Sequence, residues 1–280
     1  MGAKAPGSAL LIDCVGMDLF RAIVLGAVQG LTEFLPVSSS GHLVLADYYL
    51  FGGQALPLWV DIASNTGTFA AALLLMRHEI AQALTGFFAG LLRREARQRE
   101  GWKLALLILV ASLPALVVGL ALKGVFERIN NPVFVSFGLL LTGVILWTTP
   151  RGGPKDAPER VSLKDAFLGG LAQSLAILPG VSRSGSTIAA FLHLGLSPVL
   201  AAKLSFLMYS VASFGVMLLG LKDGLPDGVQ VGPVLAMIVA AFASGYLAML
   251  GLFSILRRGQ FRWFAPYVWA LAAWTLFTLK

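Results

Sequence analysis

The sequence predicts an all-α integral membrane protein with a single membrane domain over residues 1–280. Its composition is the first reason: 57% of the residues are hydrophobic and 12% are charged, with a mean hydropathy of +0.81, whereas soluble domains carry about 25% charged residues. Long apolar runs are the second reason, because they have the length of membrane-spanning helices. The third is two pairs of shorter apolar segments, each interrupted by a cluster of Pro, Ser and Gly.

Six apolar runs have the length of about 17 to 25 residues that a spanning helix needs. They lie at 57–76, 102–122, 132–149, 203–221, 231–256 and 262–279. The four shorter segments lie at 19–35, 42–51, 166–178 and 186–196. We expect each pair of these to be a re-entrant helical hairpin, because non-helical backbone at membrane depth survives only where protein or water satisfies its polar groups.

The two interrupted pairs are related to each other. A shift of 144 residues aligns GAVQGLTEFLPVSSSGHLVLA (26–46) with GLAQSLAILPGVSRSGSTIAA (170–190) without a gap, and eight of 21 positions are identical. Three predicted spans follow each copy, and an odd number of spans inverts the second copy relative to the first. The sequence therefore predicts an inverted repeat of residues 17–149 and 165–280, with a binding site where the broken helices meet.

The distribution of Lys and Arg predicts the orientation in the membrane. One set of loops holds thirteen of them: Arg77, Arg93, Arg94, Arg97, Arg99, Lys103, Arg151, Lys155, Arg160, Lys164, Arg257, Arg258 and Arg262. The opposite loops hold Lys123, Arg128 and Lys222. The first set is expected in the cytoplasm, which places both termini on the outside. The run RREARQRE (93–100) is expected to be a solvated helix end, with contact to lipid headgroups as the alternative.

Composition and motifs also exclude several classes of function. The net charge of +7 is spread in short clusters between apolar runs, so it indicates membrane topology and no nucleic-acid partner. Cys14 is the only cysteine, which excludes an internal disulfide. Residues 1–16 lack the pattern of a signal peptide. Walker A, H-E-x-x-H and G-x-S-x-G motifs are absent, so an ATP-driven pump, a zincin and an α/β-hydrolase are not expected.

The stretch PGVSRSGST (179–187) predicts a binding site for an anion. If its turn ends at Gly185, the residues from Ser184 to Thr187 present backbone N–H groups at a helix N-terminus, which attracts phosphate. Arg183 adds a planar guanidinium suited to phosphate oxygens. The expected phosphate-binding residues are Arg183, Ser182, Ser184, Ser186, Thr187 and, from the first hairpin, Ser38. The alternative is an arginine that reaches the surface from a serine-capped turn.

The first hairpin holds the candidate acid and base. Gln29 and Glu33 lie four residues apart and therefore share one helix face. Glu33 is expected to act as a general base or to bind a divalent cation, possible metal ligands being Glu33 with Gln29; the alternative is a structural ion pair with Arg183. His42 is a candidate nucleophile or proton carrier, or else a helix-end histidine with satisfied hydrogen bonds. Ser39 lies opposite Arg183 in the repeat.

Three further polar residues are candidates for supporting roles. Asp61 and Asn65 lie four residues apart in the first predicted span, where they are expected either to line the same cavity or to form an interhelical hydrogen-bond pair. Gln173 is the repeat partner of Gln29 and is expected to bond to the re-entrant backbone.

Two stretches of the sequence resemble a known family. GLTEFLPVSSSGHL (30–43) and PGVSRSGSTI (179–188) resemble the two signature regions of the undecaprenyl-diphosphate phosphatases of the bacitracin-resistance type. The resemblance implies a multi-pass enzyme of the bacterial inner membrane that hydrolyses undecaprenyl diphosphate to the monophosphate and recycles the lipid carrier of cell-wall synthesis. It also implies interlocked inverted repeats, an active site open to the periplasm, a divalent cation (Mg²⁺ or Ca²⁺) and a homodimer.

The family's site residues transfer by position to this sequence. Its Glu/Gln-x-x-x-Glu motif matches Gln29 and Glu33, its serine and histidine match Ser39 and His42, and its phosphate-binding arginine matches Arg183. Gln29 leaves one acidic ligand fewer, so a weaker dependence on metal is expected. The stretch SNTGT (64–68) also departs from the family pattern, which bears on the preference for lipid. The alternative function is a lipid-phosphate flippase or secondary transporter, since these too are built from inverted repeats.

Overall fold

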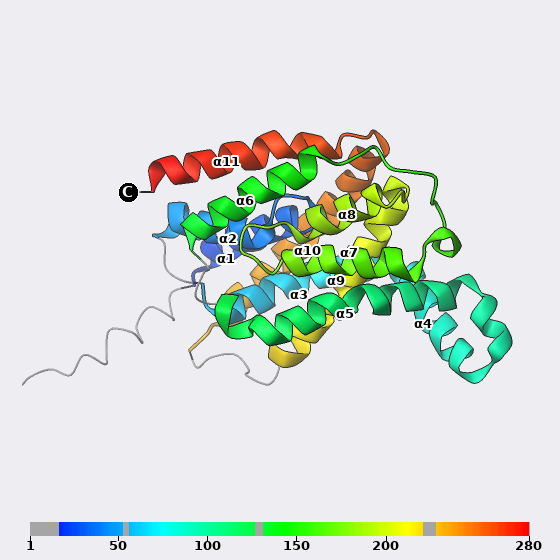
Figure 1. Cartoon of the computed structure of the whole chain (residues 1–280). Coiled ribbons are helices and arrows are strands. Elements are labelled where there is room, and N and C mark those ends of the chain that lie inside the picture. The colour runs from blue at the N-terminus through cyan, green and yellow to red at the C-terminus, as the bar shows by residue number, and fades with distance from the viewer. Residues whose placement is uncertain (1–16, 53–55, 127–130, 221–227, 280) are drawn as a thin grey trace, which may run out of the picture.

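The computed structural model describes residues 17–52, 56–126, 131–220 and 228–279, and these are predominantly α-helical (Figure 1). In chain order the elements are α1 (Leu19–Phe34), α2 (Ser39–Phe51), α3 (Leu58–Leu75), α4 (Arg77–Leu92), η2 (Arg94–Gln98), α5 (Glu100–Phe126), α6 (Pro132–Trp147), η3 (Pro158–Arg160), α7 (Leu163–Leu175), α8 (Arg183–His193), α9 (Pro198–Gly220), α10 (Val231–Arg257), η4 (Phe261–Trp263) and α11 (Phe264–Thr278). Across the described ranges, the β-type pairing is an isolated bridge between Lys155 and Leu196. Cys14, Arg128 and Lys222 lie outside the described residues.

Among the described residues, four helices are long and apolar enough to cross a membrane: α3, α5, α9 and α10. Each of them overlaps a run predicted to span. The helix α6 is a shorter apolar helix over the predicted run 132–149, and α11 follows η4 within the predicted run 262–279. The predicted all-α membrane fold is therefore confirmed at this level.

Arg77 and Arg93 were predicted to lie in one loop, but the structure has a helix, α4, between them. The pattern missed α4 because its 16 residues are shorter than a bilayer span and its first turn carries Arg77, His78 and Glu79. It packs on the start of α5, where the rings of Phe87 and Trp102 stack. The run 93–100 contains the 3₁₀ helix η2 and ends at the first residue of α5, and its residues are exposed except Ala96.

The two predicted hairpins, α1–α2 and α7–α8, begin at equivalent positions. Asp18 and Ser162 are the N-caps of α1 and α7, and Ser38 and Ser182 are the N-caps of α2 and α8. Each pair is separated by 144 residues, the shift that aligns the sequence copies. In all four cases the cap side chain accepts a hydrogen bond from a backbone N–H three residues later, which satisfies one of the unpaired donors of the helix start.

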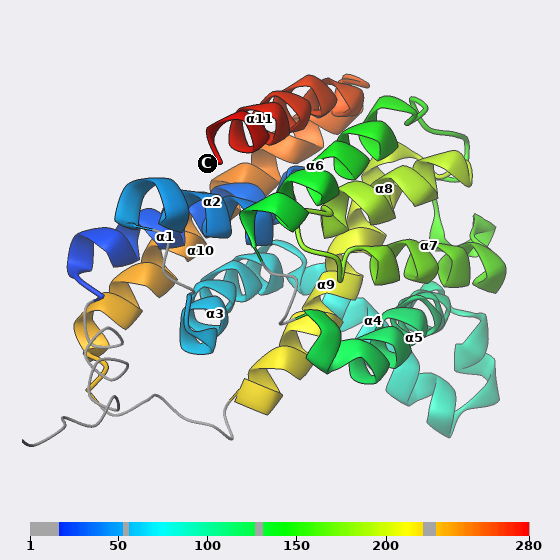
Figure 2. The same ribbon diagram turned by 60° about the vertical axis from the view of Figure 1, so that its left-hand side comes forward.

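The long helices of each half pack against the hairpin of the other half. The first hairpin helix, α1, lies along α10, and α7 lies along α5. Glycines allow both close approaches: a Cβ at Gly26 would lie 2.4 Å from the Met237 carbonyl oxygen, and one at Gly170 would lie 2.2 Å from that of Ala111. Figure 2 shows α6 beside α11 and α3 near α9, and both pairs are in contact. The two hairpins are thereby held around α3 and α9.

The turns of the two hairpins meet inside the molecule. The Ser184 hydroxyl donates a hydrogen bond to the Leu35 carbonyl at 3.0 Å, which joins α8 to the end of α1. Thr142 of α6 fixes the second turn, because its hydroxyl donates to the Gly180 carbonyl and accepts from the Ser182 N–H, both at 2.9 Å. These contacts place the start of α8 beside the end of α1.

Candidate active site

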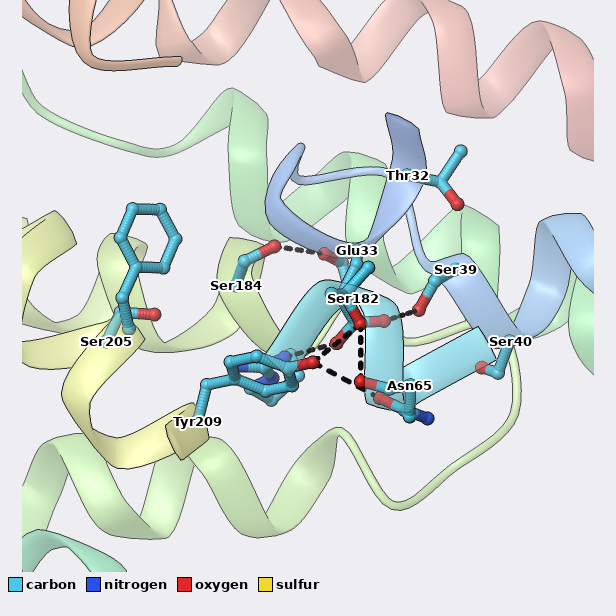
Figure 3. A network of polar contacts seen from close by, with 12 residues as sticks. Thr32, Glu33, Ser39, Ser40, Asn65, Ser182, Ser184, Ser205 and Tyr209 are labelled. Carbon is cyan, nitrogen blue, oxygen red and sulfur yellow. Dashed lines mark hydrogen bonds and ion pairs between the residues drawn. The ribbon is translucent and has the colours of Figure 1, made fainter. Parts of the chain in front are cut away.

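A cavity of about 320 Å³ lies where the two turns meet α3 and α9. Its polar wall comes mainly from the two hairpins, and its apolar wall comes from the second turn and α9. The polar lining residues are Glu33, Ser38, Ser39, Ser40, Asn65, Ser182, Arg183, Tyr209 and Ser213, and the apolar ones are Ala176, Val181, Ala212 and Val216. Figure 3 shows Glu33, Ser39, Asn65 and Tyr209 converging from separate elements.

Glu33, in the last turn of α1, is the centre of the polar network. Its Oε1 accepts a hydrogen bond from Arg183 Nη2, which forms an ion pair between the two hairpins. Its Oε2 accepts from Ser39 Oγ at 2.5 Å and from Gln29 Nε2 at 2.8 Å. Gln29 lies one turn before Glu33 on the same helix face, as its spacing predicts. The carboxylate is thus fixed by three donors and faces the cavity with the side chain of Ser39.

Arg183 is the first residue of α8 and the one basic residue among the described residues that line the cavity. Its Cζ lies 4.0 Å from the centre of the Tyr209 ring, a cation–π contact. The second terminal nitrogen, Nη1, is buried and has no hydrogen-bond partner in the described part of the chain. Because a buried donor without an acceptor costs free energy, this nitrogen is suited to bind an anionic ligand.

Tyr209 was not predicted as a site residue. It lies in the middle of α9, is 2% exposed, and its hydroxyl contacts Thr68 Oγ1 at 2.8 Å and donates to Asn65 Oδ1 at 3.3 Å. Asn65 and Tyr209 are themselves 144 residues apart. The repeat shift extended from the hairpins to the next span was therefore the signal that would have found Tyr209, since it aligns this tyrosine with the candidate Asn65.

The N-terminus of α8 differs from its prediction. Both second hairpin helices begin three residues earlier than expected, at Ser39 and Arg183, because Ser38 and Ser182 act as caps. As a result the Ser186 N–H is bonded to the Ser182 carbonyl at 2.9 Å. The prediction that Ser186 and Thr187 present unpaired backbone N–H groups is wrong: the unpaired donors of this helix start belong to Arg183 and Ser184.

Several predicted site residues do not line the cavity. The His42 ring is engaged elsewhere, since Nδ1 donates to the Ser38 carbonyl and Nε2 accepts from the Tyr267 hydroxyl, both at 2.8 Å. Thr187 is bonded to Ser205 at 2.6 Å. Asp61 and Gln173 also lie outside the lining. The remaining three are buried: Gln29, which donates to Glu33, Ser184, which bonds to Leu35, and Ser186, whose hydroxyl lacks a partner within the described residues.

The lining fits one protein ligand for a divalent cation. Glu33 is the one carboxylate among the described lining residues, and no group of three His, Cys, Asp or Glu in the described residues has the arrangement of a metal site. Magnesium is commonly held by one or two carboxylates together with substrate phosphates. The charges of Glu33 and Arg183 cancel, so this lining leaves most of the negative charge of a diphosphate uncompensated. Glu33 therefore fits as one ligand of a cation whose other ligands would be phosphate oxygens and water.

Comparison with known proteins identifies the family. The family described as bacitracin resistance protein BacA matches residues 22–274 of the chain. The chain belongs to this family. An undecaprenyl-diphosphatase from Acaryochloris marina is 56% identical over 260 residues, which cover 93% of this chain and 98% of that protein. Undecaprenyl-diphosphatases from Desulfosudis oleivorans and Carboxydothermus hydrogenoformans are 41% and 39% identical, covering 93% and 91% of this chain and 98% and 95% of theirs.

The BacA match begins at Ala22 within α1 and covers the rest of both hairpins, α3 and α9, and hence every residue that lines the cavity. The family resemblance read from the stretches at 30–43 and 179–188 is therefore confirmed. Those two stretches supply seven of the residues that line the cavity: Glu33, Ser38, Ser39, Ser40, Val181, Ser182 and Arg183.

Proposed function

We propose that this chain is a membrane phosphatase that hydrolyses undecaprenyl diphosphate, or a related prenyl diphosphate, to the monophosphate and inorganic phosphate. It would thereby recycle the lipid carrier of cell-wall synthesis in the bacterial inner membrane. The relatives named undecaprenyl-diphosphatase, similar over nearly the whole chain, support the reaction. The observation that carries the proposal is the pairing of Arg183 with Glu33 across the two turns, beside a cavity large enough for a phosphate group.

The residues at the cavity suit phosphoryl transfer, which needs mainly positioning and compensation of charge. Arg183 would bind the terminal phosphate through Nη1, with the hydroxyls of Ser182 and Ser38 beside it. Glu33 would accept a proton from the attacking hydroxyl, either water or Ser39, whose Oγ already donates to this carboxylate. The new P–O bond forms as the bond from phosphorus to the bridging oxygen breaks, and the prenyl monophosphate leaves. Attack by water forms inorganic phosphate directly, whereas attack by Ser39 forms a phosphoserine, which a water molecule must then hydrolyse to release inorganic phosphate.

As the nucleophile, Ser39 or a water molecule is favoured over His42. Both ring nitrogens of His42 already have hydrogen-bond partners and do not face the cavity. The prenyl chain of the bound substrate would extend from the cavity along the apolar wall formed by Ala212 and Val216. A divalent cation, Mg²⁺ or Ca²⁺, would bind to Glu33 and compensate the charge of the diphosphate.

We further propose that the membrane domain is an inverted repeat of residues 17–149 and 165–280, with six spans and two re-entrant hairpins. The matching caps, the paired glycines 26 and 170, and the exchanged packing of α1 on α10 and α7 on α5 support it. The excess of Lys and Arg in one set of loops supports a cavity that opens to the periplasm and termini on the same side. A homodimer is proposed from the family resemblance alone.

Phosphate release from purified protein in detergent tests the proposed function. Undecaprenyl diphosphate and shorter prenyl diphosphates are supplied with Mg²⁺, with Ca²⁺ or with a chelator, and inorganic phosphate is measured. Catalytic release that requires the protein is expected. The absence of release with every lipid and cation would contradict the proposal and favour the lipid flippase or transporter, because a detergent solution has no compartments across which transport could occur.

A further inference from the structure

One contact at the cavity has no role in the reaction steps above. The guanidinium of Arg183 lies against the Tyr209 ring, 4.0 Å from its centre. Tyr209 itself is fixed on two sides: its hydroxyl is bonded to Thr68 and Asn65 of α3, and its ring packs nearly perpendicular to that of Phe34, with centroids 5.5 Å apart. The ring is thus a rigid surface under a flexible charged side chain.

This surface bears on how Arg183 pairs with Glu33. Guanidinium and carboxylate groups often pair through two parallel hydrogen bonds. Here a single pair of atoms is joined, Nη2 with Oε1, while Oε2 is taken by Ser39 and Gln29. The other nitrogen, Nη1, has no partner within the described residues. A guanidinium that could turn freely would gain by closing fully onto Glu33, and it would then have less to offer a phosphate.

We propose that Tyr209 is a positioning residue that holds the plane of the Arg183 guanidinium, so that Nη2 binds Glu33 and Nη1 stays available to the substrate phosphate. Thr68 and Asn65 fix Tyr209 in turn through its hydroxyl. The inference rests on the proposed function, since it assigns the phosphate to Nη1. It predicts that loss of the aromatic ring weakens the binding of both the diphosphate and the product phosphate.

The test compares Tyr209→Leu with Phe206→Leu. Phe206 is a matched control because it lies on the same helix, is fully buried and packs edge-on against the same Phe34, at 5.4 Å, but contacts neither Arg183 nor the cavity. Tyr209→Leu should raise KM for undecaprenyl diphosphate, and Ki for inorganic phosphate, by about 10-fold or more, the effect of a lost desolvated cation–π contact. Phe206→Leu should lower the unfolding temperature by about as much as Tyr209→Leu does, but it should raise neither KM nor Ki.

A second comparison separates the ring's charge distribution from its shape. Phenylalanine and 3,4,5-trifluorophenylalanine at position 209 fill nearly the same space, but fluorine weakens the negative face of the ring. Tyr209→Phe loses the hydroxyl bonds but keeps the ring, so KM should stay within a few-fold of the wild type. The trifluoro ring should raise KM and Ki together by about 3-fold or more over phenylalanine. This arm remains decisive if Tyr209→Leu does not fold.

Two results would overturn the inference: equal KM values for the phenylalanine and trifluorophenylalanine proteins, or a rise in KM for Phe206→Leu as large as that for Tyr209→Leu. Both are read in a protein that releases phosphate, so they leave the proposed function intact. Failure of the wild-type protein to release phosphate would instead contradict the proposed function itself. The two failures are therefore distinguishable.

Discussion

The two hairpins have the same scaffold but carry different chemical groups. In both, a serine caps the second helix, and a glycine lets the first helix approach a long helix of the other half. The differences lie at the turns. Ser39 of the first hairpin is replaced by Arg183 in the second, and Glu33 of the first corresponds to Ile177. The duplicated backbone thus brings two similar turns together. Their different side chains give one turn a carboxylate, Glu33, and the other a guanidinium, Arg183.

A second buried ion pair lies within the first hairpin. Arg21 and Asp47 join α1 to α2 at 2.5 Å, and their side chains are 14% and 2% exposed. This pair lies within one hairpin and contributes no residue to the cavity. Arg183 and Glu33 are similarly buried, at 17% and 9%, but join two hairpins at the cavity. Burial alone therefore does not distinguish a structural ion pair from one at a reaction site; its position does.

The largest expected effect is that of Arg183→Ala. This change removes the proposed ligand of the phosphate, and loss of one group that stabilises transition-state charge costs about 10²–10³ in kcat. Phosphate release should fall by at least that factor. The matched control replaces the other buried pair by apolar residues, Arg21→Met with Asp47→Leu, which leaves no unpaired charge. A control that loses as much activity as Arg183→Ala would show that the effect is one of folding.

Glu33→Gln should have the next largest effect. The amide keeps the shape of the side chain but cannot accept a proton, and loss of a general base costs about 10²-fold or more in rate. Single-turnover phosphate release measures this, with Gln29→Ala as the control that removes a donor to Glu33 and keeps the carboxylate. A Glu33→Gln enzyme with a normal rate would exclude Glu33 as the base.

The two cap serines should respond oppositely to glycine. Ser38 has φ +71°, a conformation that costs a non-glycine residue about 1–2 kcal/mol, whereas Ser182 has φ −72° and no such strain. Glycine is also an acceptable N-cap. Ser38→Gly should therefore raise the free energy of unfolding by about 1 kcal/mol, and Ser182→Gly should lower it by about 0.3 kcal/mol. Thermal unfolding in detergent compares them; changes of the same sign would contradict the assigned strain.

The smallest expected effect is the contribution of Asp165, at the start of the second hairpin, to the loss of stability at low pH. Burial raises the pKa of Asp165, but hydrogen bonds from Lys155 and Ser162 together outweigh it and lower this pKa below its ordinary 3.8. The folded state therefore binds the proton less tightly, and the carboxylate contributes stability above about pH 4 that is lost as pH falls through the lowered pKa. The unfolding temperature should fall less between about pH 5 and pH 3 for Asp165→Asn than for the wild type. Equal falls would contradict it.

Much of the fold could be predicted because the length of an apolar run and the spacing of a repeat can both be read directly from the sequence. The overlap of α3, α5, α9 and α10 with predicted spans needed only apolar runs of sufficient length. The helix α4 escaped this criterion, since it is short and begins with charged residues. The early start of α2 and α8 escaped because the choice of cap between Ser182 and Gly185 depends on contacts from Thr142, some 40 residues away.

The site could be predicted best where the hairpins themselves carry it, and outside them Asn65 of α3 was also a candidate that lines the cavity. Glu33, Ser39 and Arg183 lie in the repeated segments, so their meeting followed from the symmetry of the turns. The position of His42 did not, because its ring is oriented by Tyr267, 225 residues along the chain. Tyr209 was missed because a single hydroxyl in an apolar span usually indicates a buried hydrogen bond and no more.

Protection of cysteines from a thiol reagent tests most directly that the diphosphate binds between the two hairpins. Ser40 of α2 and Ala212 of α9 line the cavity and are exposed, whereas Tyr48 is exposed on α2 outside it. In a Cys14→Ser protein, a methylene-bridged prenyl diphosphonate should slow labelling of Ser40→Cys and Ala212→Cys and leave Tyr48→Cys unchanged. Unaltered labelling of both cavity cysteines at a concentration of the analogue that inhibits phosphate release would contradict this account.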